Sequence, residues 1–211
     1  PYATEKFLEF TKRVMKTLRN ECYLASIELA KEKGSFPLFN KEKYLESKFI
    51  KRLPKQIQDG IAEHGIRNSH LLSVAPTGTI SLSADNVSSG LEPVFAHEYN
   101  RTILTENGPI VEPVIDYGVN FLGVRGRTTD TISALEHLSV LTTTQYYVDQ
   151  AISKTINIGD DVSWEDFKEI YKKAWQNGAK GVTTFRASGK RLGILNKTEK
   201  QPVTSCLNGS C

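Results

Sequence analysis

The sequence predicts an α/β fold with parallel strand pairing, and three observations support this. Stretches with the pattern of strands alternate with stretches with the pattern of helices along the second half of the chain. No internal repeat is present, which argues against a solenoid or a propeller. The 211 residues are 39% hydrophobic and 24% charged, a composition typical of a globular domain that can bury a core.

The composition also excludes several classes of function. No apolar run approaches the roughly 18 residues of a membrane span, and the start lacks a signal-peptide pattern, so we expect a cytoplasmic protein without a membrane partner. The net charge of +3 arises without a basic block, which argues against a nucleic-acid partner. Three cysteines do not make a disulfide framework, as is typical of the reducing cytosol. Because the chain begins with Pro1 rather than Met, we expect a piece of a longer protein.

The first thirty residues have the pattern of one long amphipathic helix, from Thr4 to Lys33, which ends at Gly34. Two short charged helices, broken by Pro54, are expected between residues 41 and 63. In the long helix, apolar residues recur at steps of three or four and predict one buried face. This face consists of Phe7, Val14, Leu18, Cys22, Ala25 and Leu29.

The middle of the chain has the pattern of a strand over residues 71–75 that ends abruptly at Pro76. Residues 98–105 are expected to be extended, and Asn107-Gly108 is a turn signal. We expect a short helix over residues 109–117, with a proline in its first turn.

The second half carries the clearest helix signal. Ser163 is a typical N-cap residue, and Asp166 stands three residues later, as in a capping box. The expected elements are a helix over 128–150, a strand over 152–158, a helix from Ser163 to Gly178, a strand over 181–185 and a mobile tail from Lys197 to Cys211.

The strongest local motif is the segment Pro76-Thr77-Gly78-Thr79-Ile80-Ser81 after the expected strand. A glycine and small hydroxyl residues at a strand end let backbone N–H groups point at an anion, and a helix that starts there would add its dipole. No GK[ST] sequence follows, which disfavours a nucleoside triphosphatase. A capped turn without a ligand explains the same residues, so both interpretations stay open.

The second motif is the pair Cys206 and Cys211 at the end of the chain. Two cysteines on a mobile tail can close a small disulfide ring and exchange electrons with a buried site. Half of a zinc site and chance placement are the alternatives, although no other Cys/His pair lies at ligand spacing. The third cysteine, Cys22, is expected to be plain core.

Other candidates carry weaker signals. Tyr146-Tyr147 suggests an electron-transfer pair or simple packing, and Lys154 suggests an anion ligand or a strand cap. The four histidines have no metal-like spacing, so no metal site is expected. Five basic residues are either phosphate partners or solvated surface residues: Arg125, Arg127, Arg186, Lys190 and Arg191.

Four ordered blocks of the sequence resemble the C-terminal half of ribonucleotide reductase, from a helix around Ser26 to the cysteine tail. A run of blocks in the same order is more specific than any one of them. The blocks are Leu72 to Ser81, Asp85 to Phe95, Tyr147 to Asn157 and Gly178 to Arg186.

The resemblance implies a ten-stranded α/β barrel, of which residues 1–195 would be the C-terminal part and residues 196–211 a flexible redox tail. In the family, the loop that matches Pro76 to Ile80 holds the substrate diphosphate, with Ser81 beside it. Cys206 and Cys211 match the pair that re-reduces the active-site disulfide. The implied partners are a ribonucleotide substrate and a thioredoxin- or glutaredoxin-type reductant.

The sequence also departs from the family. No segment resembles the loop that carries the radical cysteine, and the only other thiol is Cys22. We therefore expect the chain to be inactive without an N-terminal catalytic portion.

The resemblance also bears on the class of reductase. Metal-dependent members carry a tyrosine pair where this sequence has Thr183-Thr184-Phe185, so a long-range radical relay is not expected. The block from Asp85 to Gly90 also looks more like the class that uses adenosylcobalamin. The C-x4-C ending is familiar from the metal-radical class as well, which leaves a metal-containing partner subunit as the alternative radical source.

Two other functions stay open. One is a non-catalytic nucleotide-binding or assembly remnant of a reductase, which would gain nothing from the thiols of Cys206 and Cys211. The other is a free-standing phosphate-binding module with a redox-active tail, which does not explain the other matched blocks. Solubility of the chain expressed alone would help to separate these functions, because part of a barrel would expose apolar strand edges and tend to aggregate. An upstream reading frame that carries the missing radical-cysteine loop would settle the partner question.

Overall fold

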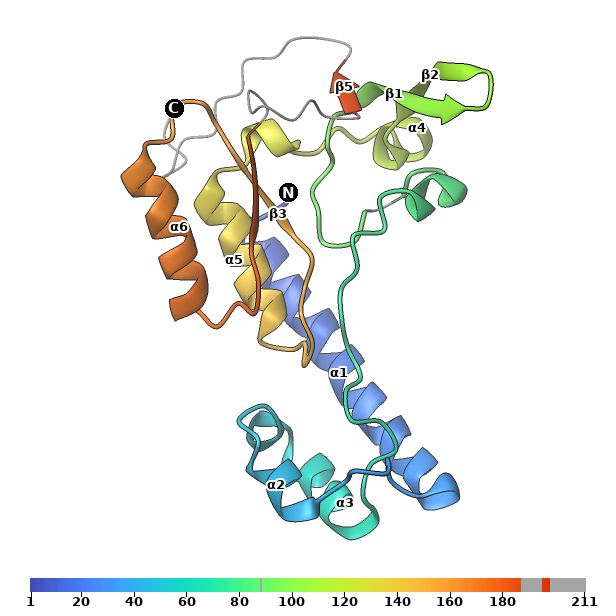
Figure 1. The fold of residues 1–211 in the computed structure, drawn as a ribbon, viewed down its shortest axis with the longest axis vertical. Coiled ribbons are helices and arrows are strands. Elements are labelled where there is room, and N and C mark those ends of the chain that lie inside the picture. The colour runs from blue at the N-terminus through green and yellow to red at the C-terminus, as the bar shows by residue number, and fades with distance from the viewer. Residues whose placement is uncertain (88, 187–194, 198–211) are drawn as a thin grey trace.

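The structure is a computed structural model that describes residues 1–87, 89–186 and 195–197. A long N-terminal helix, α1 (Glu5–Lys33), has the predicted extent and runs along two packed groups of elements (Figure 1). The Thr4 hydroxyl caps its start by accepting a hydrogen bond from the amide of Phe7. Gly34 ends it with a positive φ of 74°, and the Gly34 amide donates to the carbonyl of Ala30.

The predicted buried face of α1 is wrong. Val14 and Leu18 are 44% and 45% exposed, and the buried face lies on another side of the helix. That side includes polar residues whose partners come from distant parts of the chain, which a periodicity of apolar residues does not register. Its buried members are Thr11, Arg19, Tyr23, Ser26, Ile27 and Ala30.

The first packed group lies around the C-terminal half of α1 and contains α2 (Lys41–Glu46), a 3-10 helix (Ile50–Arg52) and α3 (Lys55–His64). Pro54 directly precedes α3, so the prediction of two short helices broken by this proline is confirmed. The buried core of this group is aliphatic with one tyrosine: Tyr23, Ile27, Ile50, Leu53, Ile57, Ile61 and Ile66.

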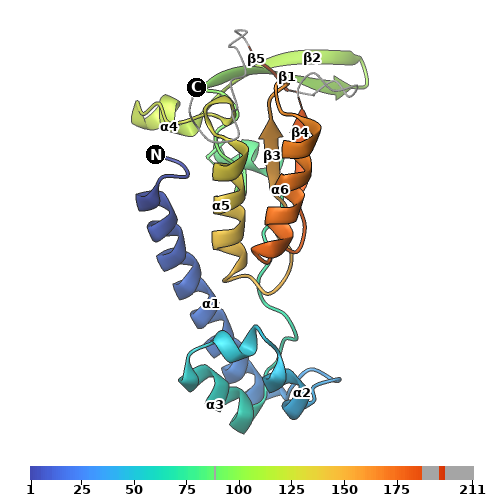
Figure 2. The ribbon, with the colours of Figure 1, turned by 90° about the vertical axis from the view of Figure 1, so that its left-hand side faces the viewer.

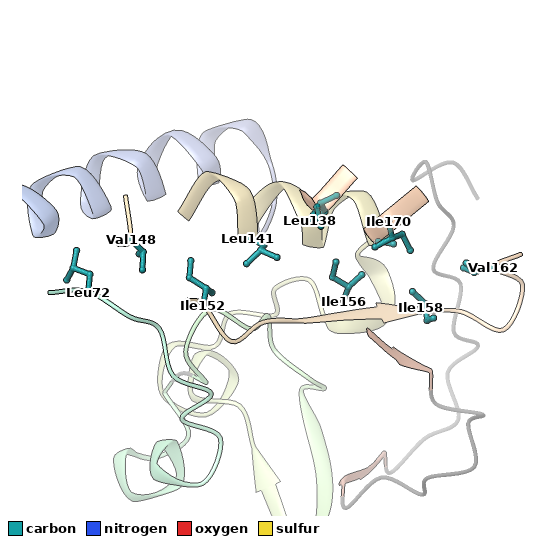
Figure 3. Packing of buried hydrophobic residues seen from close by; sticks show 11 residues of the cluster. Leu72, Leu138, Leu141, Val148, Ile152, Ile156, Ile158, Val162 and Ile170 are labelled. Atoms are coloured by element: carbon teal, nitrogen blue, oxygen red, sulfur yellow. The ribbon is translucent and has the colours of Figure 1, made fainter. Parts of the chain in front are cut away.

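The second packed group contains α5 (Ala134–Gln145), β3 (Thr155–Ile158), α6 (Trp164–Gln176) and β4 (Thr183–Arg186). Strands β3 and β4 pair in parallel, and α6 connects them, as the alternation in the sequence predicts. Helix α5 lies between α1 and α6 when the molecule is seen from the side (Figure 2). In the core, Leu138 and Leu141 of α5 and Ile170 of α6 pack with Ile156 and Ile158 of β3 (Figure 3).

The expected helix over residues 109–117 is wrong, because this segment is the second strand of a hairpin. Strands β1 (Glu98–Thr105) and β2 (Gly108–Ile115) pair antiparallel, and Gly108 adopts a φ of 108° in the predicted turn. The two prolines of β2 are tolerated because β2 is the edge strand of a sheet with the order β2-β1-β5. Strand β5 (Leu195–Lys197) pairs with the other edge of β1, and α4 (Tyr117–Leu122) follows the hairpin.

Two other expected elements are shorter than the patterns indicate. Residues 128–150 form a 3-10 helix (Thr129–Thr131) and then α5, because a capping box between Ser133 and Glu136 restarts the chain as a helix. Residues 71–75 form a single parallel bridge, between Val74 and Ile152, rather than a full strand.

The described strands form one sheet of three strands and one of two, not a closed barrel. The ten-stranded barrel therefore stays a prediction, and so does the division at residue 195. In the part of the chain that the structure describes, no helix has the length and apolarity needed to cross a lipid bilayer.

Candidate phosphate-binding site

The predicted phosphate loop, Pro76 to Ser81, connects the segment paired with Ile152 to a short 3-10 helix (Ile80–Ala84). Thr77 has a positive φ of 52°, so the chain turns sharply at this residue. The turn closes where the amide of Ser81 donates to the carbonyl of Thr77 at 2.9 Å.

The amides of Gly78, Thr79 and Ile80 donate no hydrogen bond to any described residue. All three residues are exposed, so three consecutive N–H groups are available at the surface of the turn. Adjacent free amides of this kind form a concave site for an anion. Ser81, in contrast, is buried, and its hydroxyl donates to the Gly78 carbonyl at 3.0 Å. Ser81 therefore braces the loop in this structure.

Arg101 brings a positive charge to the loop from β1. Its Nη2 donates to the hydroxyl of Thr79 at 3.4 Å. The same arginine lines a cavity of about 360 Å³ between the hairpin and the segment after the loop, where Asp85 and Asn86 also line it. A guanidinium beside free amides favours a phosphate, because it offers several donors and a permanent charge.

Gly90 lies directly behind the loop. A Cβ atom on Gly90 would lie 2.5 Å from the carbonyl oxygen of Ala75 and 3.4 Å from the Thr77 hydroxyl. Gly90 also has a positive φ of 61°, so both the backbone conformation and the close approach require glycine here. The neighbouring Ser89 hydroxyl donates to the carbonyl of Pro76 at 3.4 Å. The segment from Ser89 onward thus supports the loop from behind.

Glu92 anchors this supporting segment to the start of β3. Its Oε1 accepts a hydrogen bond from the amide of Thr155 at 2.5 Å, and its Oε2 accepts one from Lys154 Nζ at 2.9 Å. The Lys154 side chain is fully buried, and its ammonium also donates to His137 Nδ1 at 2.9 Å and to the Thr155 carbonyl at 3.1 Å. All three hydrogens of the ammonium are therefore used, which a buried charge requires.

The electrostatics of this cluster oppose any further positive charge. Burial lowers the pKa of Lys154, and the carboxylate of Glu92 opposes this change. Burial and the positive charge of Lys154 lower the pKa of His137 to about 3. His137 is therefore neutral near pH 7, and its Nδ1 can accept the hydrogen bond from Lys154.

The low pKa of His137 predicts a loss of stability in mild acid. Between about pH 6.5 and pH 3, His137 binds a proton in the unfolded chain but not in the folded chain. The free energy of unfolding therefore decreases as the pH falls through this range. We expect this histidine to remove about 2 kcal/mol of unfolding free energy between pH 7 and pH 5. Urea unfolding of the protein and of His137→Gln, each at pH 7 and at pH 5, measures this loss of unfolding free energy. An equal loss in both proteins would contradict the assignment.

The remaining residues that the sequence singled out have structural contacts. The rings of Tyr146 and Tyr147 lie 5.0 Å apart, and arginine side chains cover both, which indicates packing. Cys22 is half-buried and packs against the core of the second group, rather than lying within the core as predicted. No group of metal-ligand type forms a cluster among the described residues. Cys206, Cys211, Lys190 and Arg191 lie outside the described residues.

Three arginines proposed as phosphate partners are engaged elsewhere. Arg125 pairs with Glu98, Arg127 pairs with Glu136, and Arg186 donates to the carbonyl of Val162. Arg101 is not recognisable as a site residue from the sequence, because a single arginine in a strand pattern carries no distinguishing signal. The burial of Lys154 did leave a signal, since the positions that alternate with it on the same face of the strand are all apolar: Ile152, Ile156 and Ile158.

Most of the chain is similar to one known protein family. The family model described as "Ribonucleotide reductase, barrel domain" matches residues 1–128 and 124–185, most of the chain. The chain belongs to the ribonucleotide reductase barrel-domain family. This membership confirms the resemblance seen in the four sequence blocks.

Several curated reductases are similar to the chain. The "Vitamin B12-dependent ribonucleoside-diphosphate reductase" of Mycobacterium tuberculosis (strain CDC 1551 / Oshkosh) is 29% identical over 96% of this chain and 31% of the relative. The protein of the same name from Thermoplasma acidophilum is 29% identical over 92% of this chain and 27% of the relative. The "Ribonucleoside-diphosphate reductase subunit alpha" of Treponema pallidum is 22% identical over 92% of this chain and 23% of the relative. The chain thus spans less than a third of the length of these relatives.

Proposed function

We propose that this chain supplies the substrate-phosphate loop and the dithiol tail of a ribonucleoside reductase, the oxidoreductase that makes deoxyribonucleotides for DNA replication. The observation that carries the proposal is the loop, where three exposed amides lie beside Arg101 in a chain of the reductase family. The amides of Gly78, Thr79 and Ile80 would donate to phosphate oxygens of the ribonucleotide. Glu92 and Gly90 would keep the loop in this shape, so that the ribose is held in one place.

In this proposal, residues 1–195 are the C-terminal part of the ten-stranded barrel, and residues 196–211 are the redox tail. The parallel unit β3-α6-β4 supports the first assignment, because an α/β barrel is built from such units. An N-terminal catalytic portion would supply the radical cysteine, and thioredoxin or a glutaredoxin-type protein would reduce Cys206 and Cys211. We place this reaction in the cytoplasm.

We propose adenosylcobalamin as the radical source of the complete reductase. Relatives from M. tuberculosis and T. acidophilum carry vitamin B12 dependence in their names, and β4 has Thr183, Thr184 and Phe185 in place of a tyrosine pair. The cavity beside the loop, about 360 Å³, is far smaller than a cobalamin, so it does not fit the cofactor. The rest of the reductase would hold it. The similarity to the T. pallidum subunit alpha supports the alternative, in which a metal-containing partner subunit makes the radical.

The test is to combine the purified chain with an N-terminal portion that carries the radical cysteine. With adenosylcobalamin, a ribonucleotide and a reductant, we expect deoxyribonucleotide from the mixture and none from either part alone. Deoxyribonucleotide from this chain alone would contradict the proposal.

The loop is tested in the same mixture by Thr79→Ala and Gly78→Val. Thr79→Ala removes the hydroxyl that accepts from Arg101, and Gly78→Val places a branched side chain beside the amides, where a Cβ already lies 3.4 Å from the Ser89 hydroxyl. Each is expected to lose contacts to a charged phosphate worth about 1.5–3 kcal/mol and to weaken nucleotide affinity roughly tenfold to a hundredfold. Ser83→Ala is the matched control, because Ser83 is exposed on the same 3-10 helix and its hydroxyl donates to the Ile80 carbonyl. Equilibrium binding of the nucleotide measures all three. Unchanged nucleotide affinity in both loop variants would contradict the assignment of this loop as the substrate-phosphate site.

A further inference from the structure

A second cavity, of about 320 Å³, lies at the far end of α5, between the 3-10 helix Ile50–Arg52 and the turn after α6. It takes part in neither the phosphate loop nor the cluster around Lys154. The residues that line it include Lys48, Phe49, Arg52, Tyr146, Gly178 and Lys180.

The charge of this cavity is entirely positive. Lys48, Arg52 and Lys180 line it, and no Asp or Glu does. Neither Lys48 nor Arg52 forms an ion pair with a residue that the structure describes, whereas Lys180 Nζ donates to the carbonyl of Asp149. Unpaired cations that line a concave surface favour an anionic ligand.

Aromatic rings hold the central cation of the cavity in place. The guanidinium of Arg52 lies 4.6 Å from the centre of the Tyr146 ring and 5.2 Å from that of Phe49. Contact with ring faces leaves the N–H edges of a guanidinium free to donate, and these edges match two oxygens of a phosphate. Arg52 is therefore preorganised for a bidentate contact.

A second arginine lies behind the same pair of tyrosines. Arg19 is buried, and its guanidinium lies 5.2 Å from the centre of the Tyr147 ring. Burial lowers the pKa of Arg19, and the positive charge of Arg52 lowers it further. The nearest acid in sequence to the tyrosines, Asp149, already accepts hydrogen bonds from Tyr23 and from two backbone amides. An anion in the cavity would thus offset the repulsion between these two arginines, neither of which forms an ion pair with a residue that the structure describes.

We propose that this cavity binds a small phosphorylated anion, with Arg52 and Lys48 as its principal ligands. Its volume is at the lower end of the range for small-molecule sites, which suits a diphosphate group or a mononucleotide and not a larger cofactor. The proposal does not depend on the reductase reaction, because none of its residues belongs to the substrate loop.

The test is a titration of the isotope-labelled chain with inorganic pyrophosphate, followed by the amide NMR signals. Binding in this cavity is expected to shift the signals of Gly178 and Lys180, whereas binding at the substrate loop shifts that of Gly78. Different amide signals therefore report on the two sites, so the absence of binding at one site does not prevent detection of binding at the other. A parallel titration with ADP distinguishes recognition of the phosphates alone, which gives equal affinities, from an added contact to the base, which gives tighter binding of ADP.

Arg52→Gln is expected to weaken pyrophosphate binding at Gly178 about tenfold or more, and Lys48→Gln a few-fold. Lys48 is exposed, so its variant keeps the test valid even if Arg52→Gln disturbs the packing on Tyr146. Lys55→Gln is the matched control, because Lys55 is 81% exposed, pairs with Asp59 and lies outside the cavity. Absence of shifts at Gly178 and Lys180, or equal affinities in Lys48→Gln and Lys55→Gln, would overturn the proposal.

Discussion

Replacing Glu92 with glutamine is expected to lower the free energy of unfolding by about 3 kcal/mol. The variant leaves the ammonium of Lys154 fully buried beside an uncharged partner, and breaking a buried pair on one side costs roughly 3–5 kcal/mol. The lower end applies because the Glu92 side chain is 23% exposed, so water partly compensates the lost charge. The glutamine carbonyl can still accept the hydrogen bond from the Thr155 amide, but its NH2 group then faces Lys154 Nζ, so the measured loss reports the charge together with the hydrogen bond from Lys154.

Urea unfolding followed by circular dichroism measures this loss, and two further variants serve as comparisons. The double variant Glu92→Gln/Lys154→Met removes both charges and is expected to recover part of the stability, because no buried charge then lacks a partner. Glu28→Gln breaks an exposed pair with Lys31 and is expected to cost less than about 1 kcal/mol. A loss for Glu92→Gln no larger than that for Glu28→Gln would show that the pair does not hold the loop support in place.

Local signals in the sequence predict those elements of this fold that local interactions determine. The helix α6 starts at Ser163 as expected, because its hydroxyl accepts the hydrogen bond from the Asp166 amide at 3.1 Å. The turn at Asn107-Gly108 is also found where it is predicted. The segment after that turn has a helix signal, because Pro109 suits a first helical turn. It is a strand because β1 offers a pairing edge, a partner that residues 109–117 alone do not reveal.

The candidate site also has parts that local residues determine and parts that distant contacts determine. The loop from Pro76 to Ser81 is recognisable from its residue types, whereas its support is not. Gly90 is required by a carbonyl fifteen positions earlier, at Ala75, and Lys154 meets Glu92 across 62 positions. Such contacts arise only once the chain has folded. A lysine on the apolar face of a strand pattern is the one signal that points to a buried ion pair before the structure is known.

Replacing either cysteine of the tail is expected to stop repeated turnover in the complete reductase when thioredoxin is the reductant. Cys206 and Cys211 lie outside the described residues, so the expectation depends on chemistry and on the match to the family. Each ribose reduction consumes two electrons and leaves a disulfide in the active site. A tail with two thiols can attack that disulfide, release it as a dithiol and leave as a disulfide itself, whereas a tail with one thiol stops at the mixed disulfide.

The measurement is deoxyribonucleotide formed per enzyme, with thioredoxin or with a small dithiol as the reductant. Cys206→Ser and Cys211→Ser are expected to give about one turnover with thioredoxin, and a small dithiol that enters the site directly restores part of the activity. Cys22→Ser is the matched control, since Cys22 is a half-buried thiol that packs against the core on α1. Continued thioredoxin-driven turnover in either tail variant would mean that electrons reach the site by another route. Loss of turnover in Cys22→Ser as well would mean that the assay reports folding, because a packing residue cannot relay electrons to a distant disulfide.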